Sequence, residues 1–86
     1  MRLADLQPGQ KAIVKAIGDL GELKDRLMEL GLLCGETVQL LRRAPLGDPL
    51  ELRFGNEKIA LREEDARKID VEPISRIHRE EGKGSV

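Results

Sequence analysis

Two short segments rich in glycine and proline place the tightest limits on how this chain can fold. The first covers residues 30–35, Leu-Gly-Leu-Leu-Cys-Gly. Gly31 is placed to end a helix and Gly35 to open the strand that follows, because a residue without Cβ can adopt a positive φ at either point. The segment therefore predicts a helix directly before a strand.

The second segment covers residues 44–49, Ala-Pro-Leu-Gly-Asp-Pro. Pro45 fixes the first corner of a turn, and Gly47 and Asp48 tolerate left-handed dihedrals. Pro49 makes the residue before it extended. Because such turns join short strands, the two segments together predict a compact β domain that carries one helix.

Residues 50–61 show the clearest strand pattern, a β-hairpin around Gly55-Asn56. Glycine at the first position of a two-residue loop suits a type II′ turn, which fixes the register of the two strands. The predicted register pairs Phe54 with Glu57, Leu52 with Ile59, and Leu50 with Leu61. It brings the large apolar side chains to one face, whereas a slip of one residue would scatter them over both faces.

The residues before Gly31 have the periodicity of a helix. Leu23, Leu27 and Leu30 form one stripe of a helix that begins near Glu22. An isolated helix of about nine residues is marginal in water. We therefore expect the leucine stripe to pack against the rest of the domain.

The remaining pattern completes a small sheet. Further strands are predicted at residues 11–17, 36–43 and 68–72, with a single helical turn at residues 62–66. Five short strands with one short helix inserted after the first predict a mainly β fold, a small SH3-like barrel. We assign the barrel domain to residues 1–73 and predict a polar, mobile tail at residues 74–86.

Length and composition limit the functions open to the chain. Its 86 residues make one small domain, and with a single aromatic residue, Phe54, its interior must be aliphatic. Fifteen basic and 16 acidic residues nearly cancel, which argues against binding driven by global charge to nucleic acid or to a membrane surface. No signal peptide and no apolar run of roughly 18 to 20 residues is present, so we expect a cytoplasmic protein without direct membrane insertion.

Few side chains could carry enzyme chemistry. The chain has one cysteine, Cys34, one histidine, His78, and two serines, Ser75 and Ser85. Three of these four residues lie in the polar tail, so they cannot build a rigid catalytic triad with Cys34. A structural zinc site needs four Cys or His ligands. We therefore predict no enzyme activity, no cofactor and no metal site.

Arginines on the predicted strands allow a different role. An arginine supplied in trans can stabilise phosphoryl transfer in a partner GTPase, and the candidates are Arg42, Arg43, Arg53 and Arg62. Arginines on the surface of strands are ordinary, and we favour that interpretation. Aromatic residues on which nucleic-acid bases could stack are absent apart from Phe54, so we predict no nucleic-acid partner.

The two turn segments, with Arg42-Arg43 before the second and residues 59–62 after it, resemble the ferrous iron transport protein A family. The resemblance covers about residues 3–72. Members often carry proline where this chain has Cys34, while both glycines of the segment are in place. The resemblance implies a small cytoplasmic accessory protein that docks on a membrane ferrous iron transporter with a cytosolic GTPase domain.

A protein that acts by contact should expose apolar side chains that its core does not use. We predict that five such residues contribute: Leu27 and Met28 at the edge of the helix, Leu32 and Leu33 in the loop after it, and Leu41, which should point outward from the second strand. Packing within the core is the competing explanation for each of them. The sequence leaves open whether the chain forms homo-oligomers.

The alternative is a free-standing SH3-like regulatory or dimerisation domain, of the type found at the end of metal-dependent transcriptional repressors. Fold alone does not separate the two functions. The chain has no helix-turn-helix segment, so it could not bind DNA as a repressor unaided. A third interpretation, an RNA-binding barrel, predicts strongly salt-dependent binding to oligonucleotides.

Overall fold

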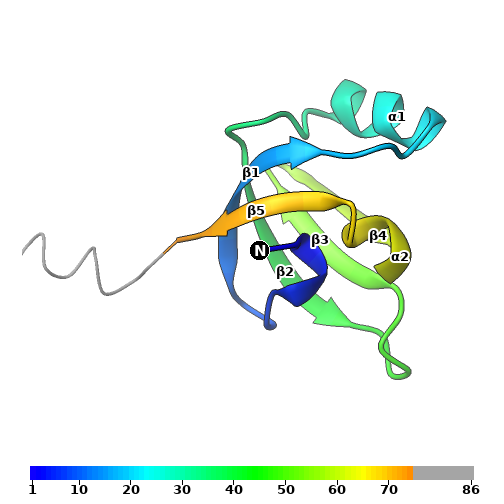
Figure 1. The fold of residues 1–86 in the computed structure, drawn as a ribbon. Helices are drawn as coiled ribbons and strands as arrows, with labels where there is room; N and C mark the ends of the chain where they lie inside the picture. The colour runs from blue at the N-terminus through cyan, green and yellow to red at the C-terminus, as the bar shows by residue number, and fades with distance from the viewer. Residues whose placement is uncertain (75–86) are drawn as a thin grey trace, which may run out of the picture.

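The computed structural model describes residues 1–74, and its five strands form one curved antiparallel sheet (Figure 1). The order across the sheet is β4-β3-β2-β1-β5. The strands are β1 Lys11–Ile17, β2 Thr37–Arg43, β3 Leu50–Phe54, β4 Glu57–Leu61 and β5 Ile69–Pro73. Within this part of the chain no ladder joins the edge strands β4 and β5, so the curved sheet stays open between them.

Three helical segments connect or precede the strands. Helix α1, Glu22–Leu30, lies between β1 and β2, as predicted. The single turn α2, Glu63–Ala66, lies between β4 and β5, and a 3₁₀ turn η1, Leu3–Asp5, precedes β1. No helix among residues 1–74 is long and apolar enough to cross a membrane. From residue 75 onward the predicted tail lies outside the described residues.

The hairpin between β3 and β4 has the predicted register. Phe54 is opposite Glu57, Leu52 is opposite Ile59, and Leu50 is opposite Leu61. Gly55 has a φ of 60°, whereas Asn56 does not have a positive φ. A type I′ turn needs a positive φ at both central residues, so the type II′ assignment is confirmed.

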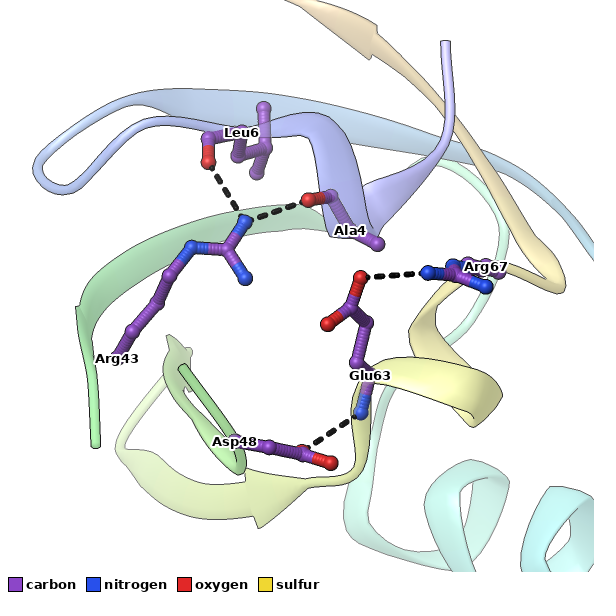
Figure 2. Close-up of polar contacts among 6 residues, drawn as sticks. All are labelled: Ala4, Leu6, Arg43, Asp48, Glu63 and Arg67. Carbon is purple, nitrogen blue, oxygen red and sulfur yellow. Dashed lines mark hydrogen bonds and ion pairs between the residues drawn. The ribbon is translucent and has the colours of Figure 1, made fainter. Parts of the chain in front are cut away.

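The glycines of the two turn segments adopt the predicted dihedrals, with φ of 108° at Gly31, 97° at Gly35 and 94° at Gly47. Asp48 does not use the left-handed region. Its carboxylate instead accepts a hydrogen bond of 2.9 Å from the backbone N–H of Glu63 (Figure 2). The first N–H groups of a helix have no partner within the helix. The β2–β3 turn therefore caps α2, a contact that the sequence did not reveal.

The core lies inside the curve of the sheet and is aliphatic apart from Phe54. Its buried members are Leu3, Ala4, Leu6, Ala12, Val14, Leu27, Leu32, Val38, Leu40, Leu50, Leu52, Phe54, Leu61, Ala66, Ile69 and Val71. The N-terminal segment contributes two fully buried leucines, Leu3 and Leu6. This segment is therefore part of the domain.

Three sequence predictions about the strands need correction. β2 begins at Thr37 rather than at Glu36, whose N–H bonds to the carbonyl of Leu33 within the preceding turn. Leu41, expected to point outward, is half-buried and falls in the shift of the β2–β3 register between Leu40 and Arg42. A bulge of this kind breaks the alternation of side chains on which the prediction rested. β5 covers Ile69–Pro73 rather than residues 68–72.

Candidate docking surface on α1

Helix α1 packs against the core of the domain mainly through one side chain. Leu27 is 2% exposed and is the buried residue of the helix, while Leu23 is half-buried against the core. The third member of the predicted stripe, Leu30, is 42% exposed, so its assignment to the core is wrong. The helix ends at Leu30, because Gly31 turns the chain through a left-handed conformation.

The C-terminus of α1 has the hydrogen bonds of a Schellman motif. The N–H of Gly31 bonds to the carbonyl of Met28, and the N–H of Leu32 bonds to the carbonyl of Leu27. This motif commonly brings its first and last side chains together. Leu27 and Leu32 are 2% and 0% exposed, so predicting them as accessible contact residues was wrong. Leucines on both sides of Gly31 at this spacing were a sequence signal for that burial.

Three apolar side chains remain exposed around this motif. Met28 is 43% exposed, Leu30 42% and Leu33 47%. At 100° per helical residue, Met28 and Leu30 lie on either side of Leu27. Leu33 is held in the next turn, where its carbonyl accepts from the N–H of Glu36. We call Met28, Leu30 and Leu33 the α1 surface; Met28 and Leu33 are accessible as predicted, and Leu30 was missed.

A shallow hollow of about 240 Å³ adjoins this surface at Leu30 and lies between α1 and the edge strand β4. Its lining is mostly apolar and comprises Leu23, Arg26, Leu27, Leu30, Ile59, Ala60 and Leu61. Because β4 is an edge of the sheet, no further strand from residues 1–74 covers this side. The sequence did not reveal the hollow, since it forms between segments about thirty residues apart.

Two of the candidate arginines, Arg42 and Arg43, have partners within the domain. The Arg43 guanidinium donates hydrogen bonds to the carbonyls of Ala4 and Leu6 and so ties the N-terminal segment to β2 (Figure 2). Arg42 lies 3.7 Å from a carboxylate oxygen of Glu51. Arg43 is therefore not free to act on a partner's phosphates, in keeping with our preference for an ordinary role.

The described residues offer little to a metal ion. No group of three or more His, Cys, Asp and Glu side chains among residues 1–74 is placed to hold one. Cys34 is exposed. His78, Ser75 and Ser85 lie outside the described residues.

We accordingly expect the purified chain to bind neither ferrous iron nor zinc at one equivalent with better than about micromolar affinity, because stable sites need several convergent ligands. Anaerobic titration calorimetry measures this directly. A stoichiometric isotherm with a submicromolar Kd for either ion would refute the expectation and would make the chain a metal carrier.

Comparison with known proteins identifies relatives over nearly the whole chain. The FeoA domain family model matches residues 1–73. A Porphyromonas gingivalis protein, named as an Fe(2+) transport protein A/Fe(2+) transporter FeoB fusion, is 39% identical over 75 residues, which are 87% of this chain and 9% of that protein. A putative Fe(2+) transport protein A of Campylobacter jejuni is 27% identical over 86% of this chain and 100% of its own length.

Solved structures show the same fold. The FeoA protein of Chlorobium tepidum is 35% identical with a TM-score of 0.84, covering 87% of this chain and 71% of that one. The zinc-complexed FeoA of Stenotrophomonas maltophilia, described as an SH3 domain protein, is 33% identical with a TM-score of 0.74, covering 84% and 89%. A manganese-dependent transcriptional repressor has a TM-score of 0.75 at 16% identity and covers 86% and 41%, a likeness of fold alone.

Proposed function

Because this chain belongs to the FeoA family, the SH3-like, non-catalytic accessory proteins of ferrous iron transport, we propose that it acts through direct contact with a membrane ferrous iron transporter. The contact uses the α1 surface and takes place in the cytoplasm, on a transporter that carries a GTPase domain. The observation that carries this proposal is the exposure of Met28, Leu30 and Leu33 on one helix end.

The fused relative supports the choice of partner. In that Porphyromonas gingivalis protein, a segment similar to this chain and a ferrous iron transporter occupy one polypeptide. A covalent link raises the effective concentration of one unit near the other. The fusion is therefore consistent with two units that work in contact and that, as separate chains, would have to bind each other.

The character of the α1 surface supports a protein contact. Exposed apolar side chains are ordinary when they occur singly, as does Leu46, which is 96% exposed in the β2–β3 turn. Three such side chains grouped around a helix end and bordered by an apolar hollow are more typical of a binding surface. Methionine adapts its shape to a partner with little strain.

Iron uptake tests this proposal in a strain whose own copy of the gene is deleted. The double substitution Met28→Gln/Leu33→Gln removes apolar contact and keeps good helix propensity at residue 28. We expect it to lower transporter-dependent ferrous iron uptake about tenfold or more, equivalent to roughly 1.4 kcal/mol of lost binding. The midpoint of thermal unfolding should stay near that of the wild type, since both side chains are exposed.

Leu46→Gln provides the matched control, because it makes the same change at an exposed leucine away from α1. Its uptake should equal that of the wild type. Undiminished uptake by the double variant, at unchanged protein level, would refute the α1 surface as the site of contact.

A further inference from the structure

A row of polar and cationic side chains crosses the face of the sheet that points away from the core. In the strand register Lys11 is opposite Gln39, Gln39 is opposite Arg53, and Arg53 is opposite Lys58. Opposite residues share a face, and their neighbours along β1, β2 and β3 are buried on the other face. Lys11, Arg53 and Lys58 are all exposed. We call these four residues the basic row.

The charges of the basic row are not neutralised within the described chain. Among residues 1–74, none of its three cations forms an ion pair or a side-chain hydrogen bond. Arg53 and Lys58 face each other directly, and like charges in that arrangement destabilise a sheet. A lysine on an edge strand discourages pairing with other chains. That role accounts for Lys58 but not for Lys11 or Arg53.

A shallow polar hollow lies along the middle of the row. Its volume is about 290 Å³, and it is lined by Lys11, Glu36, Thr37, Gln39, Arg53, Phe54 and Gly55. The Gln39 side chain is fixed by a hydrogen bond of 3.0 Å from Nε2 to the carbonyl of Gly9. The row therefore combines three exposed cations with a positioned amide, and two of the cations, Lys11 and Arg53, line the hollow.

We propose that the basic row binds an extended acidic peptide segment that crosses the strands. Neighbouring strands lie about 4.8 Å apart, so the row is about 14 Å long, which four or five extended residues span. Such a segment can place a carboxylate near each cation. This site is separate from the α1 surface and does not depend on it.

The surrounding charges favour a narrow peptide over a membrane. Glu51 and Glu72 occupy the same outer face on either side of the row, where they pair with Arg42 at 3.7 Å and Lys15 at 3.5 Å. These ion pairs carry no net charge, so the excess of positive charge on this face is confined to the row, and a broad anionic surface gains no attraction from the flanks. A single strand along the row meets Glu36 at the hollow and otherwise contacts the cations.

Fluorescence anisotropy with a labelled penta-glutamate peptide tests the proposal on the full chain, with penta-glutamine as the uncharged comparator. We expect saturable binding of the acidic peptide alone, weakened by added salt. Arg53→Gln/Lys58→Gln should raise the Kd about fivefold or more, whereas Lys24→Gln/Lys68→Gln, which makes the same change in net charge elsewhere, should leave it within about twofold.

Lys58→Glu separates binding from folding. It replaces the like-charged pair with Arg53 by an opposite-charged pair, so Tm should rise while the Kd for penta-glutamate rises about tenfold or more. A fall in Tm would refute the claim that the native pair is unfavourable. The proposed site would be refuted if the wild type showed no saturable binding of penta-glutamate. It would also be refuted if both double variants lost affinity for the peptide equally. Row-dependent binding to phosphatidylglycerol vesicles without binding to the peptide would also overturn it and assign the row to a membrane.

Discussion

Leu27→Gln should lower the free energy of unfolding by about 2 to 5 kcal/mol, because it removes a buried leucine and places an amide in an aliphatic site. Leu27 is 2% exposed and is the main anchor of a nine-residue helix. That helix would not persist undocked. For a domain of this size the Tm should fall by at least about 8 °C, as measured by circular dichroism. The same variant should also lose iron uptake, because α1 carries the docking surface.

Met28→Gln is the matched control for Leu27→Gln. The two residues are neighbours on α1, but Met28 is 43% exposed. Its substitution should change the free energy of unfolding by no more than about 0.5 kcal/mol. If Leu27→Gln unfolded at the wild-type temperature, Leu27 would not be a core residue and the packing of α1 would have to be revised.

Arg43→Met should lower the free energy of unfolding by about 1.5 to 3 kcal/mol, the range for hydrogen bonds that involve a charged group. The guanidinium joins β2 to the carbonyls of Ala4 and Leu6, and the Leu6 side chain is fully buried. Methionine keeps much of the apolar stem but donates no hydrogen bond. Urea unfolding measures the loss, and amide exchange should show that residues 3–6 become less protected first.

Arg42→Met controls for the loss of one positive charge on the same strand. Arg42 makes an exposed ion pair with Glu51 at 3.7 Å, a type of contact worth about 0 to 1 kcal/mol. Arg43→Lys should fall between the wild type and Arg43→Met, because an ammonium group can donate to a carbonyl but lacks the planar fork of arginine. If Arg42→Met and Arg43→Met lowered the free energy of unfolding equally, the Arg43 hydrogen bonds would not stabilise the N-terminal segment against β2.

Features set by local chemistry could be predicted from the sequence. Glycine at position 55 together with alternating apolar residues determined both the turn type and the hairpin register. The bounds of α1 followed from an acidic first turn and from Gly31. In each case dihedral preference and burial favoured the same structure, and that agreement makes a short segment predictable.

Features set by distant segments could not be predicted in the same way. Arg43 appeared to be an ordinary surface arginine, because its partners are backbone carbonyls 37 and 39 residues away. Leu30 and Leu27 share a helical stripe, yet only Leu27 is buried, because α1 meets the sheet along part of its length. The register shift in β2 at Leu41 depends on the pairing with β3. Residue type alone does not determine these arrangements.

Hydrogen–deuterium exchange of the chain, alone and mixed with the purified transporter, tests the docking surface most directly. We predict slower exchange on binding in Glu22–Leu30 and residues 31–35, with the sheet unchanged, and no slowing there in Met28→Gln/Leu33→Gln. Protection confined to β2, β3 and β4, or an exchange pattern unaffected by the transporter, would contradict docking through the α1 surface.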